Sequence, residues 1–463
     1  MSTTKRRNAA AAATLLALVI PAACGGEDSG ADADSITVWT TDTLPDRVRA
    51  TEAIIDRFTK ETGVEVELVG VAEDQFTQTL TSAAAADELP DVIGSLSLAS
   101  VRTLDANNLL DTDAAAAVVE SLGADTFSQE ALALTSDGDA QLSVPSEIWS
   151  QLLIYRKDLF EDAGLQPPET YDDIIAAAEE LDSEGVAGFV GPTAPADTFT
   201  QQTFEHIALA NGCELVDDGG GVVLDSSQCV GAFDFYGNLV TNYSVPGAQD
   251  VDTVRAAYFA GKTAMIVWST FILDEMAALR NDALPSCPEC RDDPAFLAKN
   301  SGFVTALQGP DGEEPAQFGE VVSWAIPTGS ATEPAQQFVE YFMSDGYVDW
   351  IAIAPEGKFP AREGTAEEPQ EYVDTWATLP VGVDKKAPLS DFYPPEVLEV
   401  LRTGPEAFDR WGITQGQGDL IGAIMGELPV PQAVAALASG EVDAQTAAED
   451  AAQTVRSIQE SLP

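Results

Sequence analysis

Hydrophobic and polar positions follow two different periods at the start of the chain. Residues 35–39 have the alternation of a short strand, and residues 46–61 place their apolar side chains on one face of a helix. Gly63 is expected to end that helix. Residues 64–69 then alternate again, which predicts a second strand. The opening pattern is therefore strand, helix, strand.

The same alternation of elements continues further along the chain. Thr170 and Asp173 have the spacing of a capping box, which predicts that a helix begins there. We also expect helices at 75–86, 333–343 and 444–462 and a strand at 90–93. Strands that alternate with helices indicate an α/β fold with mostly parallel sheets covered by helices. In such sheets ligands bind at the carboxyl ends of the strands.

Residues 1–23 have the composition of a signal peptide. A basic start is followed by an apolar run over residues 9–20 and then by small residues. That run is too short to span a bilayer alone. Cys24 follows in a context that resembles a bacterial lipobox, in which the cysteine is acylated and becomes the mature N-terminus. The alternative is ordinary secretion with an unmodified Cys24, and residues 24–34 are composed like a flexible, lipid-anchored linker.

Acidic residues greatly outnumber basic ones. The chain has 77 Asp and Glu against 22 Lys and Arg, a net charge of -55, and removal of the three bases in residues 1–23 leaves -58. This field repels nucleic-acid phosphates and anionic lipid headgroups, which argues against both as partners. The carboxylates are dispersed, which favours adaptation to a saline or alkaline habitat. The alternative is a field that steers a cationic ligand.

The histidine and cysteine content limits the possible chemistry. His206 is the single histidine, so Ser-His-Asp catalysis and multi-histidine metal sites are disfavoured. Four further cysteines in an exported protein suggest two disulfides. Of the three possible pairings we favour the local one, Cys213 with Cys229 and Cys287 with Cys290. A redox or zinc role for the last pair is the alternative, and we expect no metal and no cofactor.

Five short motifs occur in a consistent order along most of the chain. They lie at residues 36–66, 88–92, 144–173, 259–265 and 357–362. The third is the most specific, with Val144-Pro145, then Leu153-Ile154-Tyr155-Arg156-Lys157-Asp158-Leu159-Phe160, then Pro168-Glu169-Thr170-Tyr171. In this order the motifs resemble those of the extracellular solute-binding proteins of ABC importers. The most similar branch holds carbohydrate binders such as the maltose-binding protein.

The resemblance implies two α/β lobes with a ligand cleft between them. Lobe 1 is expected at 35–145 plus 302–352, and lobe 2 at 146–301 plus 353–463. The family closes on its ligand by hinge motion, and the closed form docks on the transmembrane subunits of an ABC permease. The resemblance therefore implies a monomer without enzymatic activity, held at the extracellular face of the membrane by its lipid anchor.

Candidate ligand-binding residues follow from the chemistry of a sugar. Its hydroxyls need polar side chains, and its flat C–H faces need aromatic rings. Where the family places its binding loops, the aromatic candidates are Trp39, Trp149, Trp268, Phe271, Trp324 and Phe359. The polar candidates are Thr41, Asp42, Ser95, Ser97, Glu147, Ser269 and Arg362. Core packing is the alternative for the aromatic residues, and an ion pair across the hinge is the alternative for Arg362.

Three functions are compatible with these residues. The resemblance favours a lipid-anchored receptor that captures a mono- or oligosaccharide for import. The same scaffold could bind a polyamine-like cation through Asp42, Glu147 and the ring of Trp149. A secreted glycosidase is the least favoured function. With 77 acidic residues, pairs of carboxylates occur by chance, and only a pair about 5 to 9 Å apart across a cleft would support this function.

Overall fold

The structure, a computed structural model, describes residues 35–72, 75–403 and 408–462. The expected signal peptide, the lipidation site Cys24 and the linker 24–34 lie outside the described residues. They therefore remain predictions from the sequence.

The first elements follow the hydrophobic pattern closely. They are β1 (Ser35–Thr40), α1 (Pro45–Thr62), β2 (Glu65–Gly70) and β3 (Val92–Leu96). Gly63 ends α1 with φ 82°, and its N–H donates to the Thr59 carbonyl. β1 lies between β2 and β3 and is parallel to both. This half of the sheet is the parallel arrangement that the sequence predicts.

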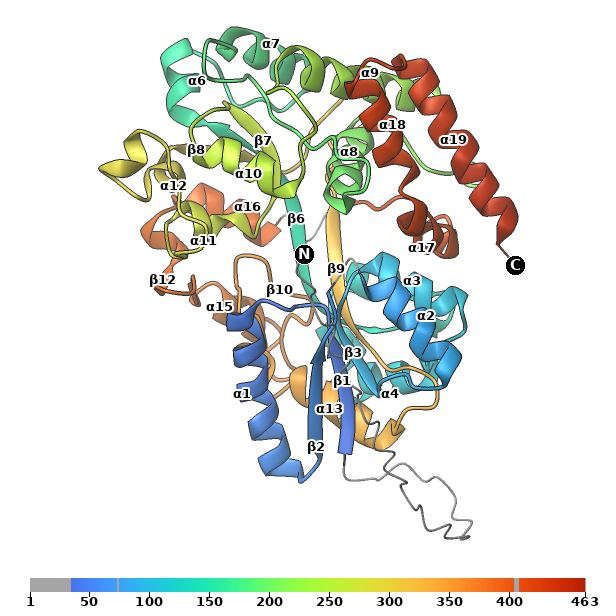
Figure 1. Ribbon diagram of the computed structural model, residues 1–463. Helices are drawn as coiled ribbons and strands as arrows, with labels where there is room; N and C mark the ends of the chain where they lie inside the picture. Colours follow the sequence, from blue (N-terminus) through green and yellow to red (C-terminus); the bar gives the residue numbers. More distant parts are fainter. Residues whose placement is uncertain (1–34, 73–74, 404–407, 463) are drawn as a thin grey trace, which may run out of the picture.

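One long strand, β6 (Val144–Arg156), passes through both halves of the molecule (Figure 1). Its first part pairs with β9 (Gly319–Ala325) and β10 (Phe359–Pro360), and β9 continues the sheet to β3. Its second part pairs with β7 (Met265–Ser269) and β8 (Ser301–Val304). The result is an eight-stranded sheet that connects two lobes.

The expectation of a mostly parallel sheet is corrected by these pairings. β6 is antiparallel to all four of its partners, and β9 is antiparallel to β3. The sheet is therefore mixed. The physical reason is that the chain crosses between the lobes on β6 and returns on β9, so the two crossing strands run in opposite directions.

Two of the expected lobe boundaries are also corrected. β8 pairs with the second part of β6, so residues 302–304 belong to lobe 2 and not to lobe 1. β10 pairs with Glu147 and Ile148 in the first part of β6, so residues 359–360 belong to lobe 1 and not to lobe 2. Both assignments depend on long-range backbone pairing, which leaves no local trace in the sequence.

Helices cover both lobes. Those packed with lobe 1 are α2 (Phe76–Ala86), α3 (Leu98–Ala106), α4 (Thr112–Leu122), α5 (Gln129–Leu134), α13 (Thr332–Phe342), α14 (Tyr347–Ile351) and α15 (Glu371–Trp376). Those packed with lobe 2 are α6 (Lys157–Ala163), α7 (Tyr171–Leu181), α8 (Thr198–Ala210), α9 (Ser227–Asn242), α10 (Val251–Phe259), α11 (Ile272–Met276), α12 (Phe296–Asn300), α16 (Pro395–Thr403), α18 (Pro429–Ala438) and α19 (Ala444–Ser461). The helix α17 (Gly418–Glu427) packs both against α3 of lobe 1 and against α19 of lobe 2. Two small hairpins, β4 (Ser136–Asp137) with β5 (Ala140–Gln141) and β11 (Pro380–Val381) with β12 (Ala387–Pro388), complete the fold.

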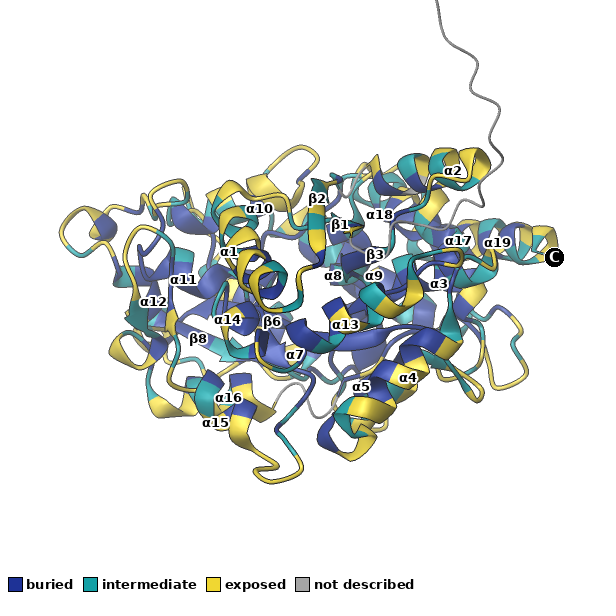
Figure 2. Cartoon of the chain, turned by 90° about the horizontal axis from the view of Figure 1, so that it is seen from below, coloured by how far each residue is buried: buried dark blue, intermediate teal, exposed yellow. Residues whose placement is uncertain are grey.

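Local signals in the sequence are reproduced at several of these helices. The capping box predicted at Thr170 and Asp173 forms at the start of α7. Figure 2 shows the amphipathic pattern, with buried residues on the inner side of helices such as α1 and α4 and exposed residues on the outer side. Such a stripe is what a helix needs to cover a sheet.

His206 on α8 is fully buried, where its Nδ1 accepts a hydrogen bond from the Phe318 N–H at 3.1 Å.

The structure joins Cys213 to Cys229 and Cys287 to Cys290, which is the local pairing that the sequence favours. All four residues are buried. The first bond links the end of α8 to α9, and the second closes a short loop ahead of α12. Each therefore holds a connecting segment against lobe 2.

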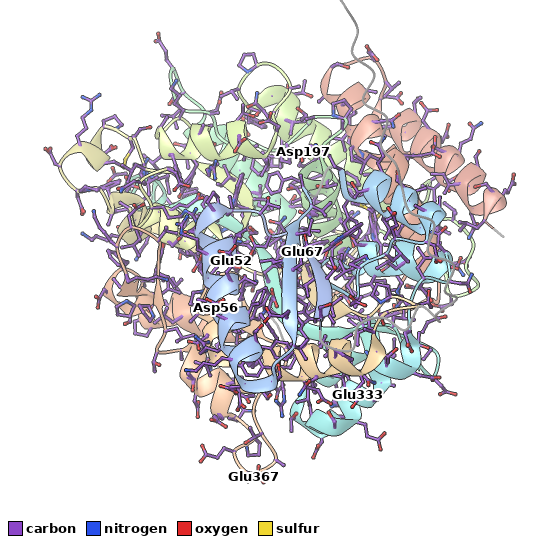
Figure 3. The ribbon with its side chains drawn as sticks, turned by 60° about the horizontal axis from the view of Figure 1, so that its bottom comes forward. Glu52, Asp56, Glu67, Asp197, Glu333 and Glu367 are labelled. Atoms are coloured by element: carbon purple, nitrogen blue, oxygen red, sulfur yellow. A yellow bond between two sulfur atoms is a disulfide. The ribbon has the colours of Figure 1, made fainter. Side chains whose placement is uncertain are left out.

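The acidic residues project from many separate elements. In Figure 3, Glu52 and Asp56 extend from α1, Glu67 from β2, Glu333 from α13 and Glu367 from a loop.

Within the described residues, no single helix has the length and apolarity to cross a membrane. The pair α17 and α18 meets that criterion only when taken together, with a bend of 48° between the two helices.

Candidate ligand-binding site

A cavity of about 380 Å³ lies between the two lobes. Lobe 1 contributes Thr41, Asp42, Arg47, Ser95, Ser97 and Ser100 to its wall. Lobe 2 contributes Asp197, Thr198, Phe199, Gln202, Val251, Trp268, Ser269 and Phe271. The crossing strands and the segment before β10 contribute Glu147, Trp149, Glu320, Val322 and Lys358. A volume of this size is typical of sites for small molecules.

Most of the expected site residues line this cavity. They are Thr41, Asp42, Ser95, Ser97, Glu147, Trp149, Trp268, Ser269 and Phe271. They come together because β1, β3 and β7 all end at the boundary between the lobes, and the residues that follow a strand then face the same space. The loops after β1 and β3 are joined directly, since the Thr41 hydroxyl donates to the Ser95 carbonyl at 2.6 Å.

Four expected residues lie elsewhere, and their assignment to the cavity is corrected. Trp324 is 1% exposed and packs against the rings of Trp350 and Phe342, each at 5.0 Å. Trp39 packs against a separate apolar cluster of lobe 1. Phe359 packs edge-on to a buried tryptophan of α15 at 4.9 Å. Trp324 and Phe359 are thus buried in a core, the partly buried Trp39 packs against its own apolar cluster, and none of the three lines the cavity.

Arg362 is the fourth of these residues. Its guanidinium donates to the Thr126 hydroxyl at 3.1 Å, to the Leu122 carbonyl at 2.9 Å and to the Met343 carbonyl. The alternative expected for Arg362 was an ion pair across the hinge. These three acceptors are instead a hydroxyl and two carbonyls. Arg362 instead joins three segments within lobe 1.

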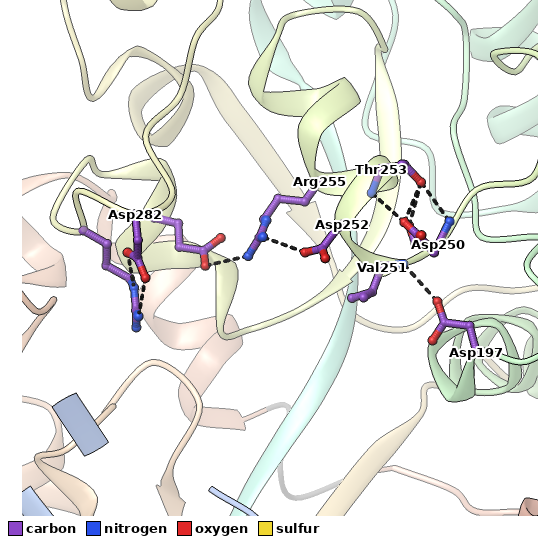
Figure 4. Close-up of polar contacts among 9 residues, drawn as sticks. Asp197, Asp250, Val251, Asp252, Thr253, Arg255 and Asp282 are labelled. Atoms are coloured by element: carbon purple, nitrogen blue, oxygen red, sulfur yellow. Dashed lines mark hydrogen bonds and ion pairs between the residues drawn. The ribbon is translucent and has the colours of Figure 1, made fainter. Parts of the chain in front are cut away.

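Several cavity residues were not anticipated from the sequence, and Asp197 illustrates why. Its carboxylate accepts from the Phe199 N–H at 3.0 Å, which caps α8. It also accepts from the Val251 N–H at 2.9 Å, at the start of α10 (Figure 4). An aspartate just before a helix is a recognisable capping signal. Its second bond joins segments that are 54 residues apart, which the sequence does not reveal.

Each acidic side chain of the cavity wall already has a partner in the protein. Asp42 pairs with Arg47 at 3.5 Å, and Asp197 accepts the two backbone N–H groups described above. Glu147 pairs with Lys358 and accepts from the Trp350 indole N–H at 2.8 Å. Glu320 accepts from Arg410 and from the Leu98 N–H, both at 2.8 Å. Three of the four carboxylates are thus paired with a cation, although the Asp42–Arg47 pair is long and Arg410 is shared with Glu205, so the wall compensates most of its negative charge.

The aromatic residues of the cavity are supported by further rings. The Trp268 ring lies 4.6 Å from that of Phe199. Trp149 is half-buried, and its ring lies 5.8 Å from Phe318 and 6.4 Å from Phe271. Rings held this way are rigid, so they can present a flat apolar surface to a ligand at little cost in side-chain entropy.

A group of buried carboxyls lies beside the cavity. Glu356 lines a small neighbouring cavity together with Trp149, and Asp274 and Glu275 are on α11. Burial raises the pKa of Glu356 to about 8, of Glu275 to about 7 and of Asp274 to about 6. At pH 7 Glu356 is therefore mostly protonated and Glu275 about half protonated, whereas Asp274 is mostly ionised.

This group predicts that the protein becomes less stable as the pH rises above 5. Between an unfolded pKa near 4.5 and a folded pKa of about 8, Glu356 binds more protons in the folded state than in the unfolded state. The free energy of unfolding should therefore fall through this window, by up to about 5 kcal/mol from Glu356 alone, and level off above pH 8. Urea denaturation at pH 5.5, 7 and 8.5 measures the free energy of unfolding across this window.

The Glu356→Gln variant is the control for this prediction, because its side chain does not titrate. Its unfolding free energy should change less with pH than that of the unmodified protein. Equal pH dependence in the two proteins would show that Glu356 titrates normally.

Comparison with known proteins gives one matching family and many similar folds. The family model of the bacterial extracellular solute-binding proteins matches residues 41–349. The putative ABC transporter periplasmic-binding protein YcjN of Escherichia coli K12 is 29% identical over 319 residues, which cover 67% of this chain and 69% of that protein. The match extends over most of both lobes.

Three solved structures illustrate the similarity of fold. Maltose-bound MalE3 of T. maritima has a TM-score of 0.70 at 18% identity, covering 92% of this chain and 99% of that one. A sugar transporter protein of Arthrobacter chlorophenolicus with bound laminaribiose has a TM-score of 0.71 at 19% identity, covering 91% and 99%. UgpB of Mycobacterium tuberculosis in complex with glycerophosphocholine has a TM-score of 0.69 at 16% identity, covering 92% and 98%. The two-lobed α/β fold expected from the sequence is confirmed.

Proposed function

The chain belongs to the bacterial extracellular solute-binding proteins, and from this premise we propose that it captures a neutral mono- or oligosaccharide for import. Proteins of this family serve ABC transporters and bind their substrates without transforming them. The expectation that the chain is not an enzyme is therefore confirmed by its family. The proposal concerns the class of ligand and its delivery.

The compensated charge of the cavity wall is the observation that carries the proposal. Asp42, Glu147, Asp197 and Glu320 are each paired with a cation or with N–H donors of the protein. A polyamine needs carboxylates that are free to pair with it, since a buried cation without a partner is costly. A neutral ligand needs no charge from the wall and can use the remaining lone pairs and N–H groups as hydrogen-bond partners.

The remaining wall residues fit a polyol. Hydroxyl and amide groups come from Thr41, Ser95, Ser97, Ser100, Thr198, Gln202 and Ser269. The rings of Trp149, Trp268 and Phe271 add flat surfaces from the crossing strand and from lobe 2. MalE3 and the Arthrobacter protein, which share this fold, are described with maltose and laminaribiose bound. These features together support a sugar over a cation.

Delivery and anchoring are further parts of the proposal. We place the protein at the outer face of the cell membrane, held by a lipid on Cys24 and the linker 24–34, as a monomer. There its closed form delivers the ligand to the transmembrane subunits of an ABC permease. The proposal rests on the family and on the lipobox-like sequence.

A binding screen tests the class of ligand. The protein without residues 1–23 is screened by thermal shift against mono- and disaccharides, maltose and laminaribiose among them, and against spermidine. A sugar should raise the melting temperature, because binding stabilises the folded state by RT ln(1 + [L]/Kd). Its affinity should change little between low and high salt, whereas charge-paired binding weakens strongly. A response to spermidine alone contradicts the proposal.

A further inference from the structure

Phe271 is a point at which segments of both lobes meet. The Arg47 guanidinium, from the start of α1 in lobe 1, lies 4.9 Å from the centre of the Phe271 ring in lobe 2. The backbone of Gly357 packs directly against the same ring, since a Cβ on Gly357 would lie 2.1 Å from it. Arg47 is therefore held at the boundary of the lobes by an aromatic contact.

Two buried carboxyls adjoin this point. Asp274 follows Phe271 by one helical turn, and Glu356 precedes Gly357. They are only 1% and 4% exposed. The charge of Arg47 lowers the pKa of both carboxyls against the larger upward effect of burial, so the guanidinium acts on both electrostatically.

Hydrogen bonding at this point is incomplete. Among the described residues, the Nε of Arg47, the Oδ1 of Asp274 and the Oε2 of Glu356 are buried without a hydrogen-bond partner. A buried polar atom without a partner costs free energy comparable to a lost hydrogen bond. A second arrangement that joins these three atoms would remove that cost.

The present partner of Arg47 is a weak one. Its Nη1 lies 3.5 Å from the Asp42 carboxylate, which is at the long limit for a charge-assisted hydrogen bond. Asp42 lines the cavity, so a ligand can reach it. Arg47 thus lies between a cavity carboxylate that holds it loosely and two buried carboxyls that each have one oxygen without a hydrogen-bond partner.

Building on the proposed function, we propose that Arg47 is a positioning residue that exchanges partners when the ligand binds. A ligand hydroxyl that donates to Asp42 frees the guanidinium to pair with Glu356 and Asp274. The pairing with Asp274 links α1 of lobe 1 to α11 of lobe 2 and so holds the lobes closed around the ligand.

This exchange predicts the release of a proton on binding. Burial raises the pKa of Glu356 to about 8, and pairing with Arg47 lowers it, so the proton of Glu356 leaves to solvent when the pair forms. Because the bound state prefers the ionised carboxyl, affinity should rise with pH up to about 8 and then level off. The other charged or titratable groups near the two carboxyls are Glu275, Arg280, Asp282, Lys386 and Tyr393.

Calorimetry at pH 7.5 in two buffers of different ionisation enthalpy measures the number of protons released on binding, with maltose and laminaribiose as ligands. We expect release of a fraction of one proton per ligand and a three- to tenfold gain in affinity between pH 6 and pH 8. Glu356→Gln should bind without releasing a proton and without pH dependence. Arg47→Met should lose the proton release and about tenfold in affinity. Arg49→Met, an exposed position on the same helix, is the matched control and should behave like the unmodified protein.

A second measurement needs no ligand. Asp42→Asn removes the cavity partner of Arg47 and should mimic the ligand, giving a smaller radius of gyration in X-ray scattering, whereas Arg47→Met and Arg49→Met should not. If sugar binds without proton release and Asp42→Asn stays as open as the unmodified protein, the exchange is wrong and the proposed function stands. If no sugar binds but Asp42→Asn closes the lobes, the proposed ligand is wrong and the exchange stands.

Discussion

Replacing Glu147 by alanine is expected to lower the free energy of unfolding by about 3–5 kcal/mol, because the change leaves Lys358 buried without its counter-charge. The side chains of Glu147 and Lys358 are only 2% and 3% exposed. The substitution also removes the acceptor of the Trp350 indole N–H. The cation–π contact between Lys358 and the Trp350 ring, at 3.9 Å, cannot replace a carboxylate.

Two further variants separate this effect from a simple loss of packing. Glu147→Met with Lys358→Met removes both charges and should recover most of the lost stability, since paired apolar replacements of buried ion pairs are often tolerated. Lys299→Met breaks an exposed pair with Asp293 and should cost less than about 1 kcal/mol. Urea denaturation measures all three. A cost for Glu147→Ala no larger than for Lys299→Met contradicts the prediction.

Local features of the fold were predictable from the sequence. The ends of α1 and α19 lie within one residue of the predicted ends, because a periodic apolar face, capping residues and Gly63 are all local signals. The direction of the crossing strands was not predictable. β6 is buried along almost its whole length, so it shows no alternation that would reveal its partners. Its antiparallel pairing with β9 joins residues more than 160 positions apart.

The site was predictable in part for a similar reason. Residues that directly follow β1, β3 and β7 reach the cavity because strand ends meet at the boundary of the lobes. Arg47 and Lys358 were missed because their roles depend on Phe271 and Glu147, which are distant in the sequence. Trp324 was assigned to the cavity wrongly. Its ring packs directly over Gly94, a position where any Cβ would clash, and the sequence does not show that contact.

The structure also changes how Glu147 is understood. From the sequence it was expected to contact the ligand, and it does line the cavity. Both of its oxygens, however, are already used by Lys358 and Trp350. Its main role is therefore to hold the crossing strand β6 to the segment before β10, and any contact with the ligand uses a carboxylate that is already neutralised.

Replacing Trp149 by alanine is expected to weaken sugar binding by about 30- to 150-fold, or about 2–3 kcal/mol. Trp149 is the half-buried residue of β6, at the point where the strand crosses between the lobes. Its ring is held by Phe318 and Phe271, so it is already in place for stacking against a sugar. Truncation removes this surface. It also removes a ring that supports Phe271, which contacts the Arg47 guanidinium. Calorimetry with maltose and laminaribiose measures the affinity without depending on tryptophan fluorescence.

Matched substitutions decide whether the loss comes from the cavity. Trp149→Phe keeps a flat ring and should retain most of the affinity. Trp324→Phe alters a tryptophan that lies in the core of lobe 1, so it should lower the unfolding free energy and leave the dissociation constant unchanged. If Trp149→Ala binds as tightly as the unmodified protein, or if Trp324→Phe weakens binding equally, the ligand does not stack on Trp149. The cavity would then have to hold its sugar through Trp268 and the polar wall residues alone.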